Sequence, residues 1–146
     1  MRRKWLPAAL VVAAAAAFSG AAGSASTGPA TIRITDTQVA DVYLGSGVGE
    51  REVVRTTLYA RSGHTKAIGQ AAMVCTYITR RQRSCTSTFA LPKGTLVASG
   101  LLTTRLIYQL AVVGGTGLYD NVRGTLTVTH LGGAPERELL LFRLNI

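Results

Sequence analysis

The chain has 146 residues, which is one domain's worth, and 47% of them are hydrophobic. Its 16 Lys and Arg exceed its 7 Asp and Glu, so the formal net charge is +9. This balance can signal nucleic-acid binding, but the basic residues are spread along the chain and only residues 80–83 (RRQR) are clustered, in a predicted turn. We therefore expect no nucleic-acid partner and an exposed hairpin tip at RRQR, with contact to an anionic surface or polymer as the alternative.

The N-terminus has the layout of a secretory signal peptide. Basic Arg2, Arg3 and Lys4 precede the apolar residues 5–18, and small residues follow. We expect cleavage around residues 22–30, a signal peptide over 1–28 and a single domain over 29–146, secreted and without an integral membrane segment. The apolar run is short and alanine-rich for a membrane span, although an uncleaved anchor is the alternative. Removing the three basic residues leaves 13 Lys and Arg against 7 Asp and Glu, a charge of +6.

The rest of the chain is predicted to be all-β. Short segments rich in Val, Ile, Leu, Thr and Tyr alternate with turns rich in Gly, Pro and Asn, and no helical periodicity is sustained. Eight strands are expected near residues 31–39, 51–60, 67–79, 84–91, 95–102, 105–113, 122–130 and 137–146. Eight strands with short connections favour a closed antiparallel barrel or a sandwich. A barrel removes exposed edges and leaves an interior wide enough for packed side chains or one small ligand.

Cys75 and Cys85 are the only cysteines, and in an exported chain such a pair most often forms a disulfide. If two strands flank a short loop centred on Arg80, the two cysteines lie directly opposite each other, near the separation that a disulfide needs. The pair is therefore predicted to be structural.

The glycine-rich stretch VVGGTGLYDNVRGTLTV at residues 112–128 has two possible meanings. A phosphate-binding loop would lead into a helix, but strand-like, β-branched sequence follows Gly117. The structural alternative is a tight connection between strands, with a bend or close backbone approach at Gly124. The second meaning is favoured.

The same stretch resembles the signature of the dirigent and allene oxide cyclase barrel-like proteins, in which a strand leads to Gly-Gly-Thr-Gly, an aromatic residue, Arg-Gly and another strand. Upstream, GQAAMVCTYI and CTSTFALPKGTLVASGLL are similar to two preceding strands of bacterial exported members. The resemblance spans roughly residues 35–146. The signature residues are Gly114, Gly115, Thr116, Gly117, Tyr119, Val122, Arg123 and Gly124.

The resemblance implies an eight-stranded antiparallel β-barrel, calycin-like in shape and commonly a homotrimer, with a hydrophobic cavity. It implies a protein that binds a small hydrophobic molecule and steers its cyclisation or coupling, as a cofactor-free cyclase or isomerase if it is an enzyme. The alternative is a non-catalytic exported barrel with a binding, storage or surface-interaction role. Asp36 and Asp41 lack the flanking residues of the plant motif, so no catalytic residue is transferred.

Candidate lumen residues are the polar side chains expected in mid-strand: Tyr59, Tyr77, Tyr108, Arg55, Arg105 and Gln109. An arginine and a tyrosine in an apolar cavity could orient a carbonyl or stabilise negative charge. The alternative is that the tyrosines lie at the rim and the arginines face solvent. His64 and His130 have no partner at metal-ligand spacing, so no metal is expected, and no spacing favours a pair among the seven acids.

Overall fold

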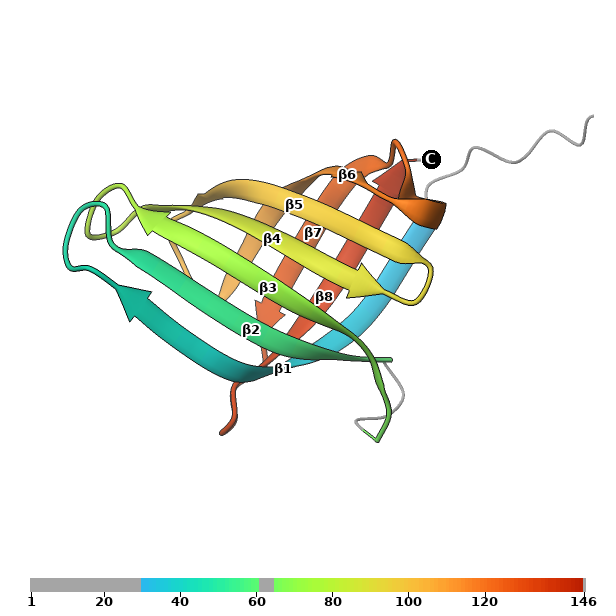
Figure 1. The fold of residues 1–146 in the computed structure, drawn as a ribbon, viewed down its shortest axis with the longest axis horizontal. Coiled ribbons are helices and arrows are strands. Elements are labelled where there is room, and N and C mark those ends of the chain that lie inside the picture. The colour runs from blue at the N-terminus through green and yellow to red at the C-terminus, as the bar shows by residue number, and fades with distance from the viewer. Residues whose placement is uncertain (1–29, 61–64, 146) are drawn as a thin grey trace, which may run out of the picture.

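The computed structural model of the chain describes residues 30–60 and 65–145 (Figure 1). The predicted signal peptide, residues 1–28, lies outside the described residues, and Ala30 is the one position of the expected cleavage region that they include. The described strands are β1 (Ala30–Leu44), β2 (Arg51–Ala60), β3 (Ala67–Tyr77), β4 (Arg83–Leu91), β5 (Gly94–Leu102), β6 (Ile107–Gly115), β7 (Arg123–His130) and β8 (Arg137–Asn145), with one 3-10 turn, η1 (Gly117–Tyr119).

The eight strands form one closed barrel in which each strand pairs antiparallel with its neighbours in sequence. Pairing of β1 with β8, from Ala30 opposite Leu144 to Thr37 opposite Arg137, closes it. The predicted all-β fold is thus confirmed, as an eight-stranded antiparallel barrel rather than a sandwich. No helix within residues 30–60 or 65–145 has the length and apolar character needed to cross a membrane.

Alternation along each strand divides the side chains between the barrel interior and its outer surface. On β7 and β8, Leu126, Val128, Leu140, Phe142 and Leu144 are buried. Phe142 packs edge-on against Phe89 of β4 at 5.1 Å between ring centroids. Together with the buried leucines of β5 and β6, these residues fill one half of the barrel.

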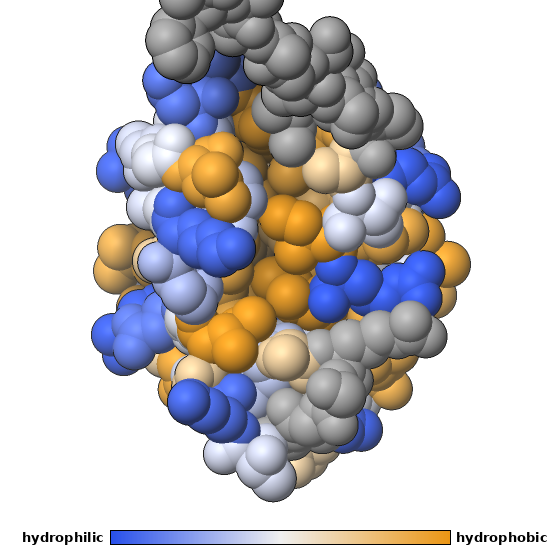
Figure 2. Space-filling model, turned by 90° about the vertical axis from the view of Figure 1, so that its right-hand side faces the viewer, coloured by the Kyte–Doolittle hydropathy of each residue, from blue (hydrophilic) through white to orange (hydrophobic). Residues whose placement is uncertain are grey.

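Figure 2 looks onto the end of the barrel at the right of Figure 1, where hydrophobic residues gather in the middle of the face among hydrophilic ones. The turn between β6 and β7 lies at this end, where η1 is drawn beside the C-terminus in Figure 1. Val122, which follows η1, is fully buried, and Tyr119 packs against the core. This end of the barrel is thus filled by side chains.

A β-bulge in β1 changes which residues face inward. The register with β2 shifts between Gln38 and Ala40, so that Val39 is the extra residue. Before the bulge Asp36 pairs with Leu58, and after it Tyr43 pairs with Glu52. With the bulge, β1 continues to Leu44, so that residues 40–44, which the sequence allowed as a separate extension, belong to the same strand.

The glycine signature forms the connection from β6 through η1 to β7, and steric demands explain its glycines. Gly117 has φ +64°, and a Cβ there would lie 2.5 Å from the carbonyl oxygen of Lys93. Gly124 has φ +156°, and a Cβ there would lie 2.0 Å from the carbonyl oxygen of Arg143. Thr116 contributes through its hydroxyl, 2.7 Å from that of Thr95. The stretch holds backbones in close contact at the turn and along the β7–β8 pair.

Cys75 and Cys85 form a disulfide between directly opposed residues of β3 and β4. Both are fully buried and point into the barrel. The predicted hairpin register, in which Gln70 also faces Ala90, is confirmed. The disulfide therefore joins two adjacent strands in the barrel interior.

Candidate functional site

A cavity of about 180 Å³ occupies the half of the barrel that the apolar core leaves open. Its walls come from all the strands except β5, and from the loop that precedes β6. A narrower pocket of about 30 Å³ shares Asp36, Tyr108 and Glu138 with it and is otherwise mostly apolar. The lining residues of the larger cavity are Asp36, Gln38, Asp41, Glu52, Val54, Thr56, Met73, Arg83, Arg105, Leu106, Tyr108, His130, Glu136 and Glu138.

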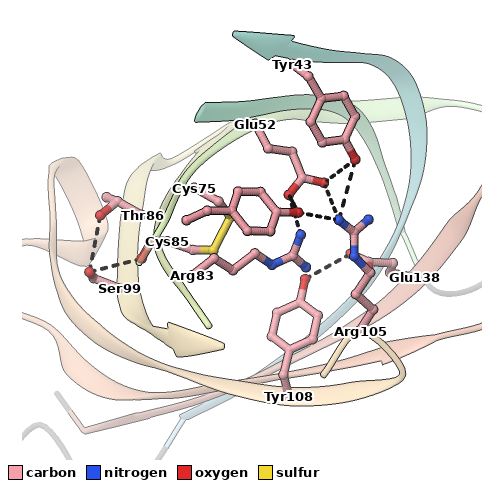
Figure 3. The surroundings of a disulfide bond; sticks show 11 residues. Tyr43, Glu52, Cys75, Arg83, Cys85, Thr86, Ser99, Arg105, Tyr108 and Glu138 are labelled. Carbon is pink, nitrogen blue, oxygen red and sulfur yellow. Dashed lines mark hydrogen bonds and ion pairs between the residues drawn. A yellow bond between two sulfur atoms is a disulfide. The ribbon is translucent and has the colours of Figure 1, made fainter. Parts of the chain in front are cut away.

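Glu52 of β2 is the centre of a polar network on one wall of the cavity (Figure 3). It is 1% exposed, and its carboxylate forms ion pairs with Arg83 of β4 and, at 3.1 Å, with Arg105. Tyr43 donates a hydrogen bond to Oε1 at 3.0 Å, and Tyr77 donates one to Oε2 at 3.2 Å. Four side chains from separate parts of the barrel thus satisfy one buried carboxylate, as burial of a charge requires.

Arg105 connects the loop before β6 to this network. Its Nη2 donates to the Tyr77 hydroxyl at 2.7 Å and to the Tyr43 hydroxyl at 3.4 Å. Burial raises the pKa of Tyr43, and the neighbouring Glu52 raises it further against the lowering effect of Arg105. The tyrosine therefore stays neutral and acts as a hydrogen-bond donor to Glu52.

A second polar group lies on the opposite wall and comprises Asp36, Tyr108 and Glu138. The Tyr108 hydroxyl is 3.5 Å from Oε2 of Glu138, toward which it points in Figure 3. Asp36 lies on β1 directly opposite Glu138 on β8, and its Oδ1 accepts a hydrogen bond from the Glu138 backbone N–H at 3.0 Å. Two carboxyl groups 102 positions apart in the sequence are therefore neighbours inside the barrel.

Burial perturbs the acid–base chemistry of this second group. Burial, and then the charge of Asp36, raises the pKa of Glu138 to about 7. Burial likewise raises the pKa of Asp36 to about 6, and it raises the pKa of Tyr108 well above its ordinary value. Near neutral pH the Asp36–Glu138 pair can therefore hold or release a proton, which an exposed pair of carboxylates would not do.

The structure places three of the six predicted lumen residues at this end of the barrel interior. Tyr108 and Arg105 line the cavity, and Tyr77 contacts Glu52 beside it. Their contact with a ligand stays a prediction. Arg105 forms an ion pair with Glu52, and the Tyr77 hydroxyl donates a hydrogen bond to the same carboxylate.

The other three predicted residues are not brought into the cavity. Arg55 lines a shallow depression on the outer surface, because it alternates with the inward-facing Val54 and Thr56. Gln109 is exposed and contacts Thr127 from outside, since it alternates with the buried Tyr108 and Leu110. Tyr59 pairs with Thr35, next to the inward-facing Leu58, and is absent from the lining of both cavities. The expectation that these side chains face the lumen is corrected.

The sequence reasoning missed Glu52, Arg83 and the Asp36–Glu138 pair. Spacing favoured no pair of acids, because the two partners belong to the first and last strands, which meet only when the barrel closes. A usable signal was nevertheless present: Glu138 alternates in phase with the buried Leu140, Phe142 and Leu144. An acidic residue that shares the buried face of a strand with apolar residues is expected to point its carboxyl group into the barrel.

Known structures give the fold a context. The pterocarpan synthase dirigent protein GePTS1 superposes with a TM-score of 0.65 at 15% identity, covering 80% of this chain and 86% of that one. AbnU, an exo-specific intermolecular Diels-Alderase, gives 0.64 at 15% identity, with 80% and 98% covered. The chain therefore shares the barrel fold of these dirigent and Diels-Alderase proteins.

A pyocyanin demethylase also superposes, with a TM-score of 0.62 at 25% identity, covering 76% of this chain and 98% of that one. No protein-family model matches the sequence, and no curated protein matches it either. Within the part of the chain that the structure describes, no three metal-ligating side chains gather into a group that could hold an ion.

Proposed function

We propose that the protein is an exported barrel that binds a small, largely apolar molecule in its cavity and steers the cyclisation or coupling of that molecule without a cofactor. The observation that carries the proposal is the cavity itself. Half of the barrel is filled by side chains, whereas the other half holds about 180 Å³ of space against the buried carboxyl group of Asp36 and the half-buried one of Glu138, both with raised pKa values. A cavity of about 150 Å³ suffices for a benzene ring.

Confinement is the first contribution that such a cavity makes to a reaction. A flexible molecule held between rigid strands loses conformations that do not lead to ring closure, and part of the activation entropy is met on binding. The apolar extension lined by Leu110, Leu126 and Leu140 would hold a small apolar substituent. This contribution requires no charged residue.

Proton transfer is the second contribution. In a ring closure where an attacking hydroxyl loses a proton and another atom gains one, the Glu138 carboxylate accepts the first proton and the resulting acid donates it to the second position. The enzyme is unchanged at the end, so no co-reactant is needed. A pKa near the working pH favours both steps, and Asp36 fixes the strand that carries Glu138 through its bond to the Glu138 N–H.

Native mass spectrometry of the mature protein, after exposure to a metabolite extract of its source, tests the proposal. We expect one retained small molecule, and its conversion when fresh extract is incubated with the protein. Val54→Phe places a ring in the cavity and is expected to abolish retention, whereas Val53→Phe, one residue along and pointing outward, leaves it intact. An empty barrel under all conditions would overturn the proposal, and retention without conversion would favour the non-catalytic alternative.

Export and assembly belong to the same proposal. The signal-peptide pattern of residues 1–28 supports export, and the resemblance to trimeric barrels supports a homotrimer. N-terminal sequencing of the secreted protein is expected to give a start between residues 22 and 30. Light scattering after gel filtration is expected to give three times the mass of the processed chain.

A further inference from the structure

The acidic residues of this basic protein are concentrated around one cavity. The whole sequence has 16 Lys and Arg but only seven Asp and Glu. Five of those seven acids line the cavity, namely Asp36, Asp41, Glu52, Glu136 and Glu138. The remaining two are Glu50 and Asp120, which are absent from its walls. The cavity is therefore rich in acidic residues, although the protein as a whole is basic.

The cations of the cavity compensate only one of these acids. Arg83 and Arg105 both form their ion pairs with Glu52. Among the described residues, no lysine or arginine nitrogen lies within ion-pairing distance of the other four carboxyl groups. Asp36, at 3% exposure, and the half-buried Glu138 thus face the cavity without an ion pair of their own, and Arg83 acts on Glu138 only from beyond ion-pairing distance.

The space around the uncompensated acids has both a charged and an apolar part. Asp36, Tyr108 and Glu138 line the larger cavity and also its narrow extension, whose other walls include Phe89 and Met73. A molecule that fills both volumes brings an apolar group beside the two carboxyl groups. Its charge therefore decides how well it binds, since electrostatic interactions strengthen where water is excluded.

We propose that the cavity takes a small organic cation: a protonated or quaternary amine carried on an apolar body about the size of one aromatic ring. This inference rests on the proposed function and specifies its substrate class. A cation loses its hydration shell on entry and regains favourable contact with Asp36 and Glu138, while the exposed Asp41 and Glu136 attract it to the entrance. An anion of the same shape would be repelled by all four.

Binding of a cation is coupled to the protonation of the acid pair. The protonated form of Glu138 leaves the cavity less negative, so a cation binds with release of that proton and its affinity increases as pH rises through about 6 to 8. Four charged or titratable groups face Glu138 from other strands: Asp36 from β1, Arg83 from β4, Tyr108 from β6 and His130, directly opposite, from β7. Glu136, in the turn just before β8, is the fifth.

A matched set of probes tests the inference. Benzylamine as its ammonium ion, benzyl alcohol and benzoate share one ring and differ in charge. Isothermal titration calorimetry is expected to rank the cation at least about tenfold tighter than the alcohol, with benzoate weakest. Titration of benzylamine at pH 7 in two buffers with different ionisation enthalpies is expected to show net proton release, which the alcohol should not show.

Variants separate the acids of the cavity from charge in general. Glu138→Gln is expected to weaken benzylamine binding about tenfold and to abolish the proton release, while alcohol binding changes little. Asp120→Asn removes one negative charge from the exposed turn after η1 and should change neither. The double variant Asp41→Asn with Glu136→Gln changes exposed side chains only and is expected to slow cation association without unfolding the protein.

The outcomes distinguish this inference from the proposed function. Equal affinity for alcohol and amine, or tighter binding of benzoate, would overturn the cation preference but leave a ligand-binding barrel. Loss of affinity in Asp120→Asn equal to that in Glu138→Gln would assign the effect to overall charge and would also overturn it. Binding of none of the three probes would reject the cation inference, whereas retention of a metabolite in mass spectrometry decides the function.

Discussion

Glu52 and Arg83 form a buried ion pair across two strands of the barrel interior. Glu52 lies opposite Cys75 in the pairing of β2 with β3, and Arg83 lies two residues before Cys85 on β4. The ion pair therefore spans β3 and lies beside the disulfide, as Figure 3 shows. Polar and covalent links thus connect the same three strands at the open end of the barrel.

Removal of Arg83 is expected to destabilise the barrel. Arg83→Ala leaves the buried Glu52 without one of its two cations, and breaking a buried pair costs about 3–5 kcal/mol of unfolding free energy. Replacing both partners, with Glu52→Leu and Arg83→Met, should recover a large part of that loss because no charge is then left unpaired. Urea denaturation measures both. Arg80→Ala, at the exposed hairpin tip, is the control and should cost little.

Loss of the disulfide is expected to cost about 2–3 kcal/mol on the chain-entropy model for a loop this short. Cys75→Ala with Cys85→Ala removes the bond without burying an unpaired polar group. Thermal unfolding followed by circular dichroism should show a lower midpoint for the variant. A reducing agent should lower the midpoint of the natural protein and leave that of the variant unchanged. Identical melting of the two proteins would mean that the bond does not contribute.

Stability is expected to decrease as pH rises from about 4 to about 7. Asp36 and Glu138 have pKa values of about 6 and about 7 in the folded protein, above those of the unfolded chain, so the folded state holds more protons in this window. The stabilisation by protonation is complete below the unfolded pKa values and is lost as pH passes the folded ones. Unfolding free energies measured from pH 4 to 8 test this, and Glu138→Gln should flatten the slope. A rise in stability over the same range would contradict the assigned pKa shifts.

The glycines of the signature are expected to differ in their tolerance of alanine. Gly124→Ala would place a methyl group against the Arg143 carbonyl oxygen in a positive-φ conformation, so little soluble protein is expected. Gly114→Ala has no atom nearer than 3.5 Å and no positive φ, so it should fold with a stability change below about 1 kcal/mol. Soluble yield and urea midpoints compare them. Equal behaviour of the two variants would refute the steric explanation.

The fold could be predicted because its determinants are local in the sequence. Alternating strands, short turns and the hairpin register around Arg80 each depend on a few neighbouring residues, and the cysteine pairing followed from that register. The bulge at Val39 is different. It depends on how β1 fits the curvature of the closed barrel, and nothing in the alternation of residues 31–44 indicates a shift there.

The site was less predictable because closure of the barrel assembles it. Tyr108 and Arg105 could be predicted as lumen residues, because each is a polar side chain within an otherwise apolar segment. Asp36 and Glu138 meet only through the pairing of the first and last strands, which no local pattern encodes. Arg55 and Gln109 were misplaced because both faces of these strands carry apolar residues, so that inside and outside look alike in the sequence.

The bulge in β1 lengthens the strand without deciding which residues line the cavity entrance. Gln38 pairs with Thr56 and Ala40 with Arg55, so Val39 is the extra residue between them. Deleting Val39 would let Ala40 follow Gln38 directly, and regular alternation would then keep Asp41 and Tyr43 facing inward, as Asp36 does. A deletion at this point would therefore change the bend of the strand and leave the entrance with its carboxylate and its phenol.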